Sequence, residues 1–183
     1  DANTTGSYNI GIGSGALGSL TTPTHNTALG FNAGTTNITG GDNVYIGNYA
    51  GNSSTGVRNT YLGYSAGYSN STASDNTCLG YSAGTNQTTG GQNVFIGRSA
   101  RGSSGGTSVS IAIGFNIVGA GDYFTTLGSG AGSDRVYNQF SANASWTRAS
   151  DLRYKDEIVN NTDCGLAFIN DLRPVTFKFK ALA

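Results

Sequence analysis

Few residues of this 183-residue chain belong to the types that carry out metal or acid–base chemistry. Cys78 and Cys164 lie far apart, and two thiols are too few for a disulfide framework or a metal cluster. The single histidine, His25, precedes a predicted strand with no cysteine or carboxylate cluster beside it in the sequence. Phosphate-binding loops, dinucleotide fingerprints and catalytic triads are also missing from the pattern. We therefore expect no metal, no cofactor and no enzyme that acts on an external substrate.

One recurring position carries aromatic side chains that are suited to ligand contact. It follows a glycine that recurs along the chain, and its occupants are Phe31, Tyr64, Tyr81 and Phe115, with Asn48, Arg98 and Ser129 in other copies. An exposed aromatic ring can cover the apolar face of a sugar ring. The same rings can also pack between chains, so the sequence leaves both interpretations open.

These aromatic positions belong to a repeat that reads N-β-x-[IL]-G-x-x-A-G, where β is a β-branched residue. Its glycine recurs every 17 residues, with one spacing of 16 and a last one of 14, at Gly13, Gly30, Gly47, Gly63, Gly80, Gly97, Gly114 and Gly128. A fixed period of this length is typical of a solenoid, in which each coil is stabilised by its neighbours. With 29 glycines and only 11% charged residues, the composition favours turns over long helices.

Alternate residues before each repeat glycine predict a short strand. The residue immediately before it is Ile12, Leu29, Ile46, Leu62, Leu79, Ile96, Ile113 or Leu127, and the residue two earlier is Ile10, Thr27, Val44, Thr60, Thr77, Val94, Ile111 or Thr125. Side chains two apart on a strand share a face. We expect this pair to point inward in each coil and to stack in ladders about 4.8 Å apart.

Three further columns have a structural interpretation. An alanine three residues after most repeat glycines indicates a close approach, and the glycines that follow it, Gly34, Gly51, Gly67, Gly84 and Gly132, are predicted to take positive φ at a corner. Each strand is preceded by an asparagine, at Asn9, Asn26, Asn43, Asn59, Asn76 and Asn93. Stacked asparagines can bond to the coils on either side, so we expect a ladder and not a ligand site.

A coil of 17 residues encloses a thin interior, so we expect three identical chains to share a core around one axis. The fold class is thus an all-β, trimeric repetitive β-solenoid or β-roll with about eight 17-residue coils, followed by a short α+β C-terminal segment. The repeat resembles the head repeats of trimeric autotransporter adhesins and the repetitive shafts of phage tail fibres. Its coils are a few residues longer than is usual in those families.

Charged residues are sparse in the repeats and concentrate after Asp122, which indicates a change of structure near Gly132. We divide the chain into a solenoid shaft over 1–132, a neck or cap over 133–149 and a C-terminal segment over 150–183. Apolar residues at helical spacing from Cys164 to Leu172 predict a helix, and the alternation after Pro174 predicts a strand.

The C-terminal segment resembles the start of the endosialidase-type intramolecular chaperone of phage tailspikes. The matching residues are Ser150, Asp151, Arg153, Lys155 and Ile158, then Gly165 to Ile169 and Leu172 to Lys180. The resemblance implies a domain that assists trimer assembly and then cuts itself off, with Ser150 as nucleophile, Lys155 as general base and the scissile bond between Ala149 and Ser150. Burial in an assembled trimer could lower the lysine pKa enough for this role. The alternative is that Ser150 caps a helix or turn and Lys155 is a solvated charge.

Together these features predict a structural and receptor-binding part of a phage tail fibre or spike, on the virion and outside the cell. Expected partners are two further copies of the chain, other tail-fibre or baseplate proteins, and a host surface glycan or outer-membrane component. Zero formal net charge argues against nucleic acid as a partner. The alternatives are a bacterial surface adhesin head, which should continue into a heptad stalk that this sequence lacks, and a self-cleaving serine peptidase precursor.

Overall fold

A computed structural model describes residues 6–132, 134–139 and 147–148 of the chain. The chain divides into two compact units, Asp1–Ser150 and Asp151–Ala183, and the second lies outside the described residues. The helix and strand predicted around Cys164 and Pro174 therefore fall outside the description, as does Trp146 in the predicted neck.

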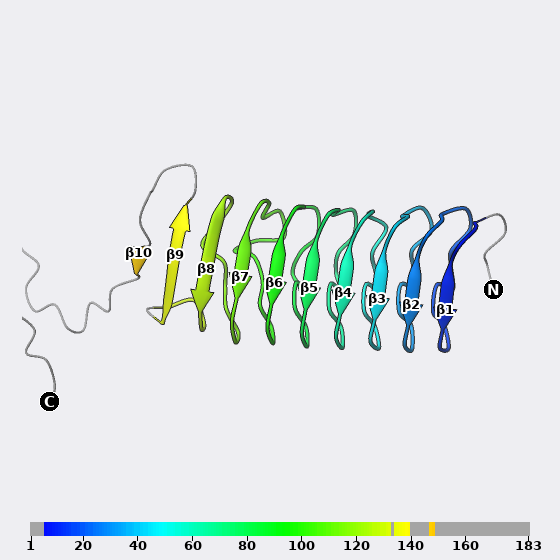
Figure 1. Cartoon of the computed structure of the whole chain (residues 1–183), viewed down its shortest axis with the longest axis horizontal. Helices are drawn as coiled ribbons and strands as arrows, with labels where there is room; N and C mark the ends of the chain where they lie inside the picture. The colour runs from blue at the N-terminus through cyan, green and yellow to red at the C-terminus, as the bar shows by residue number, and fades with distance from the viewer. Residues whose placement is uncertain (1–5, 133, 140–146, 149–183) are drawn as a thin grey trace, which may run out of the picture. The chain divides into compact units, whose positions relative to one another are not determined.

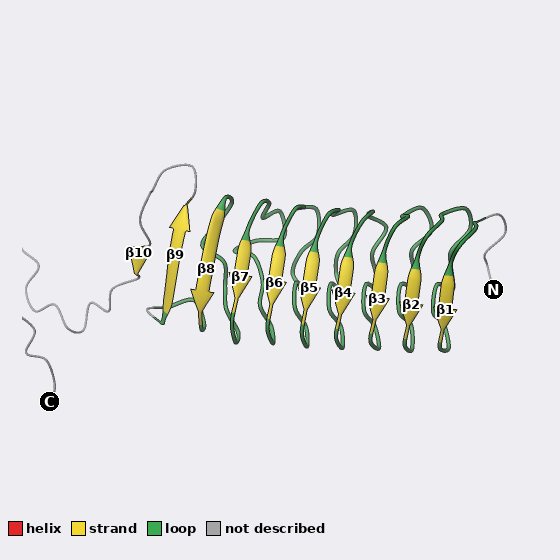
Figure 2. Ribbon diagram, viewed as in Figure 1, coloured by secondary structure: helices red, strands yellow, loops and turns green. Residues whose placement is uncertain are grey.

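The first unit is a β-solenoid with one short strand per coil, which confirms the predicted all-β coil stack (Figures 1 and 2). Eight strands pair in parallel and in sequence order: β1 Ile10–Ile12, β2 Thr27–Leu29, β3 Val44–Ile46, β4 Thr60–Leu62, β5 Thr77–Leu79, β6 Val94–Ile96, β7 Ile111–Ile113 and β8 Phe124–Gly128. Two antiparallel strands follow, β9 Arg135–Gln139 on β8 and β10 Thr147–Arg148 on β9. The described residues contain no helix.

A repeat glycine directly follows each of β1 to β7 and is the last residue of β8, because no other residue fits this position. All eight have φ between 121° and 144°, a region that residues with a side chain rarely adopt. A Cβ built on Gly80 would lie 2.7 Å from the carbonyl oxygen of Gly97 in the next coil. Backbone thus stacks directly on backbone along this column, and the chain turns there.

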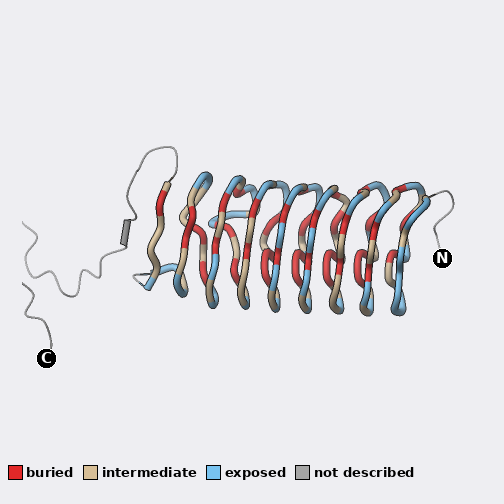
Figure 3. The backbone as a smooth tube through the Cα atoms, viewed as in Figure 1, coloured by how far each residue is buried: buried red, intermediate tan, exposed pale blue. Residues whose placement is uncertain are grey.

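The expected inward pair points outward, which corrects the core prediction. In β2 to β8 the middle residue of the strand is buried, at Ala28, Tyr45, Tyr61, Cys78, Phe95, Ala112 and Thr126. The flanking residues are exposed or half-buried, except Thr125. Figure 3 shows this alternation along the strands. A period of two predicts two faces, but it does not say which face is covered.

The strand column inside the stack consists of side chains of unequal size. Tyr45, Tyr61 and Phe95 are fully buried, and the rings of Tyr45 and Tyr61 lie 5.7 Å apart. Corner glycines make room for these rings, because a Cβ on Gly34 would lie 2.5 Å from Cδ2 of Tyr45. Burial raises the pKa of the Cys78 thiol far above its usual range, so this cysteine is an inert part of the core.

The alanine and glycine columns behave largely as predicted. Ala33, Ala50, Ala66, Ala83 and Ala100 are completely buried, which confirms the close approach at this position. The predicted positive φ is found at Gly34, Gly51, Gly67 and Gly84, with values of 58° to 66°. It is not found at Gly132, because the last repeat leaves the coil pattern before this residue and joins the antiparallel β9.

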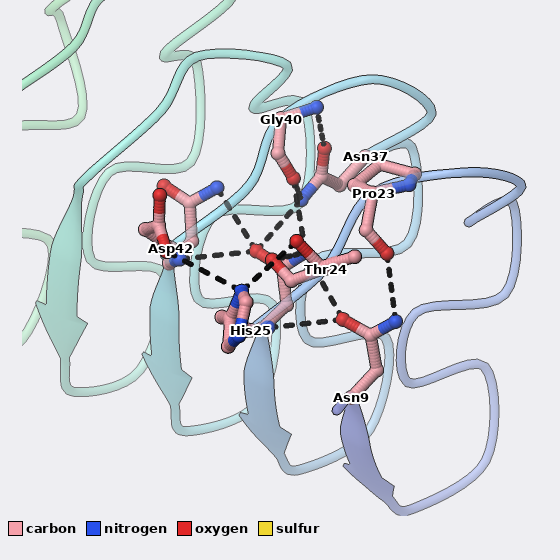
Figure 4. A network of polar contacts seen from close by, with 9 residues as sticks. Asn9, Pro23, Thr24, His25, Asn37, Gly40 and Asp42 are labelled. Atoms are coloured by element: carbon pink, nitrogen blue, oxygen red, sulfur yellow. Dashed lines mark hydrogen bonds and ion pairs between the residues drawn. The ribbon is translucent and has the colours of Figure 1, made fainter. Parts of the chain in front are cut away.

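The predicted asparagine ladder is confirmed, and its first rungs are seen in Figure 4. The Oδ1 atom of each asparagine accepts a hydrogen bond from the backbone N–H one coil further on, as Asn26 does from Asn43 at 3.0 Å. The Nδ2 group donates to a carbonyl on the returning side of the coil, as Asn26 does to Gly40 at 3.0 Å. Ser110 donates the last of these bonds, from its backbone N–H to Oδ1 of Asn93.

Candidate functional site

The outer face of the parallel sheet is lined by apolar and threonine side chains, and we call it the apolar face. It consists of the outward residues of β1 to β7 and includes the exposed side chains Ile10, Ile12, Leu29, Leu62, Leu79 and Ile113. The other positions on it are Val, Ile or Thr, and no charged residue stands among them. Parallel sheets are normally covered on both faces, so an open apolar face of this length indicates an interaction surface.

A second surface runs along the corner that follows the strands. Its members are Phe31, Tyr49, Tyr64, Tyr81, Arg98 and Phe115, and we call it the aromatic–arginine ladder. Tyr64 and Tyr81 are stacked at 5.3 Å and 8° between ring planes, so their faces are turned towards each other. This pair therefore offers a ligand its ring edges and hydroxyl groups more than its faces.

The sequence did not single out Tyr49 for this ladder. It stands one position beyond the aromatic column, in the coil whose column position is Asn48. Its ring lies edge-on to Phe31 at 5.3 Å and to Tyr64 at 5.9 Å, so it closes the gap between these two rungs. Tyr49 could have been recognised from the sequence, because position 48 lacks the aromatic residue of the column and the next residue is a tyrosine.

Arg98 occupies a special position in the ladder. Its guanidinium carbon lies 5.7 Å from the centre of the Tyr81 ring and 5.5 Å from the centre of the Phe115 ring. Cation–π contact with two rings holds the planar group between them. The side chain is exposed, and no carboxylate of the described residues lies within ion-pair distance of it.

His25 is less isolated than the sequence suggests. It stacks on Tyr8 at 5.1 Å, and its Nδ1 atom lies 3.8 Å from Oδ1 of Asp42, in the next coil (Figure 4). His25 and Asp42 are one full coil apart in the sequence, so they meet only because successive coils lie on one another. The described residues contain no group of three or more His, Cys, Asp or Glu side chains arranged to hold a metal ion.

The same column continues with an ion pair between coils. Arg58 donates from Nε to Oδ1 of Asp75 at 2.6 Å and from Nη2 to Oδ2 at 3.0 Å. This bidentate contact raises the pKa of Arg58 and lowers that of the Asp75 carboxyl, through the hydrogen bonds first and the opposite charge second. Arg58 is thus already neutralised, in contrast to Arg98.

The predicted catalytic residues Ser150 and Lys155, and the bond between Ala149 and Ser150, lie outside the described residues. Their roles stay predictions. Within the described part of the chain, no helix has the length and apolar character needed to cross a membrane.

Comparison with known proteins adds no relative to this picture. No protein-family model, curated protein or solved structure matches the chain. The functional argument therefore depends on the repeat, on the apolar face and on the aromatic–arginine ladder.

Proposed function

We propose that this chain is the trimeric, receptor-binding shaft of a phage tail fibre or spike, which stands outside the cell and contacts a host surface glycan. Two further copies of the chain are its first partners, and other tail-fibre or baseplate proteins hold it on the virion. The C-terminal segment assists assembly of the trimer.

The observation that carries this proposal is the apolar face. Full burial of a Leu or Ile side chain is worth about 1.5–3 kcal/mol, and a lone chain leaves part of that stabilisation unused in every coil. Leu62 and Leu79, for example, are 42% and 41% exposed in adjacent coils. Three such faces turned towards one axis cover each other along the whole stack.

Glycan contact is assigned to the aromatic–arginine ladder because it lies beyond the strand ends, outside the apolar face. The tyrosine hydroxyls and ring edges that it exposes are suited to the hydroxyl groups of sugars. Rigid coils hold these groups at a regular spacing, which fits a polymer of repeating units.

The decisive test is the molar mass of the full-length chain in solution, measured by light scattering coupled to size exclusion. We expect three times the chain mass for the wild type and one chain mass for the double variant Leu62→Asp, Leu79→Asp, because a trimer would bury those carboxylates without partners. Ile38→Asp is the matched control, since Ile38 is 47% exposed but lies in a loop outside the apolar face. A monomeric or dimeric wild type contradicts the proposal.

The self-processing role implied by the C-terminal segment has a separate test. Intact mass is compared between the wild type and Ser150→Ala after expression of the full-length gene product. A chain that ends at Ala149 only when Ser150 is intact supports cleavage by this residue. A segment retained in both forms leaves a fibre without peptidase activity.

A further inference from the structure

The arginine of the aromatic–arginine ladder is exposed, contacts two aromatic rings and forms no ion pair with a described residue. Tyr81 and Phe115 lie on its two sides, at 5.7 and 5.5 Å from the guanidinium carbon. Contacts made by the two faces of a guanidinium leave its N–H groups free, because these donors point outward in the plane of the group. No hydrogen bond from this guanidinium to another described residue is found, so the donors are open to solvent.

The other arginines of the coils differ from Arg98 in this respect. Arg58 is held by both carboxylate oxygens of Asp75, and Arg101 donates from Nη1 to Oδ1 of Asn116 at 3.2 Å. Arg135 donates to the carbonyl of Val118. Among these four arginines, Arg98 is the one whose side chain makes no hydrogen bond to another described residue.

The neighbouring rungs provide further polar groups. Tyr81 and Tyr64 are about half exposed, and their stacked rings leave edges and hydroxyl groups for a ligand. A planar cation beside a row of hydroxyl donors is suited to an anionic group on a chain that also carries hydroxyl groups, since guanidinium groups bind carboxylate, sulfate and phosphate with two parallel hydrogen bonds.

From this geometry we infer that the ladder binds an acidic glycan, whose carboxylate, sulfate or phosphate group is held by Arg98 while the adjoining sugar contacts Tyr81 and Tyr64. This inference rests on the proposed glycan-contact function and specifies the chemical class of the receptor. Asn48 and Ser129 replace the aromatic residue in other coils, so the acidic unit binds in the coils around Arg98 and not along the whole stack.

The test is binding of the full chain to matched pairs of immobilised oligosaccharides, measured by surface plasmon resonance. The panel holds uronic-acid, sialic-acid, sulfated and phosphorylated oligosaccharides, each with its carboxyl-reduced, desulfated or dephosphorylated form. We expect at least one acidic member to bind about tenfold or more tighter than its neutral form, with an affinity that falls as salt is added. The pair that responds identifies which anion is recognised.

Two variants locate the site. Arg98→Gln should remove that preference, and Arg98→Lys should recover only part of it, because a lysine keeps the charge but lacks the planar fork. Arg58→Gln is the control with the same change in net charge, and it should bind as the wild type does. Each variant is first checked for an unchanged molar mass in solution.

The outcomes separate this inference from the proposed function. A trimer that binds neutral and acidic forms equally, or binds no acidic member of the panel, overturns the acidic-glycan inference and leaves the trimeric fibre standing. Equal binding by the wild type and Arg98→Gln also overturns it. A monomeric wild type contradicts the proposed function itself, whatever it binds.

Discussion

Each buried asparagine of the ladder connects two coils. Asn59 accepts a hydrogen bond from the backbone N–H of Asn76 at 3.0 Å and donates from Nδ2 to the carbonyl of Ala73 at 3.0 Å. Its side chain is completely buried, so water cannot replace either bond. The amide needs both an acceptor and a donor, which explains why an aspartate does not stand at this position.

The variant Asn59→Asp should therefore be strongly destabilised although it has nearly the same shape. It keeps the acceptor, but it loses the donor and places a carboxylate against the Ala73 carbonyl, at a cost of roughly 3 kcal/mol or more. Burial would raise the pKa of this carboxyl in the folded state. Stability relative to the wild type should thus be greatest below the unfolded-state pKa of about 4 and fall as the pH rises.

Equilibrium unfolding in urea at several pH values measures this effect. Asn48→Asp is the control, because Asn48 is exposed and uses its Oδ1 atom only to accept a bond from the Phe31 N–H, at 3.1 Å. Equal losses of stability in the two variants would show that the buried donor does not matter.

The exposed ion pair between Arg58 and Asp75 predicts a titration shift without a large effect on stability. The Asp75 pKa is lowered by hydrogen bonds from Arg58, so any stabilisation by the pair is present at neutral pH and is lost as the pH falls through the folded-state pKa. Carboxyl-carbon NMR titration should find Asp75 below the usual aspartate range in the wild type and within it in Arg58→Gln. An unchanged Asp75 pKa in the variant would contradict the bidentate contact.

At the scale of the strand, backbone contact between coils sets the sequence. The repeat glycines have positive φ and lie so close to the next coil that any side chain would meet its carbonyl group. The strands between them are three residues long in β1 to β7, so each strand depends on its neighbours.

Gly80→Ala should accordingly lower the free energy of unfolding by roughly 3 kcal/mol, because the residue has φ of 131° and its new Cβ would lie 2.7 Å from the Gly97 carbonyl oxygen. Gly132→Ala is the matched control, since no atom lies within 4 Å of the position of its Cβ and its φ is not positive. Urea unfolding of both variants is the measurement. A tolerated alanine at Gly80 would mean that the coils can separate at this column.

At the scale of the whole stack, the coils are connected in series and each contacts only its neighbours. The C-terminal end is covered by β9, which pairs antiparallel with β8. The apolar face runs across the strands, so it grows with every coil that is added.

Removal of one complete period should therefore be tolerated. Deletion of residues 64–80 takes out β5 and one asparagine of the ladder, Asn76, and it brings β4 and β6 together with Tyr61 beside Phe95 in the core. Circular dichroism should show an unchanged β spectrum per residue, with a urea m-value lowered in proportion to length. Deletion of residues 64–72 is the out-of-register control, and it should abolish the cooperative transition. Loss of folding in both would contradict a modular stack.

The sequence by itself determined the repeat, and with it most of the fold. The spacing of Gly30, Gly47 and Gly63 predicted one strand per coil, and the asparagine column predicted the ladder, because both features recur with the period of the coil. A glycine that recurs with the period of the coil indicates a backbone requirement, and an asparagine that does so indicates a hydrogen bond between coils. Their local physical requirements could therefore be inferred without any tertiary contact.

Only the tertiary structure decided which strand face is inside. The outward Leu and Ile residues recur more regularly than the buried middle residues, whose sizes range from Ala28 to Tyr45. Regular apolar residues therefore suggested a core where the structure has a surface. The interior tolerates this variety because corner glycines and alanines leave room for the large rings, and such compensation between residues of different coils cannot be read from one column.

The aromatic–arginine ladder could be predicted only in part from the sequence. Its column of Phe31, Tyr64 and Tyr81 was evident from the repeat, whereas Tyr49 and the position of Arg98 between two rings depend on how successive coils stack. A sequence fixes which side chains occupy equivalent positions in successive coils. Their distances and the direction of their faces follow from the stacking of the coils, because rotamers are chosen by contacts with neighbours that are 16 or 17 residues away in the chain.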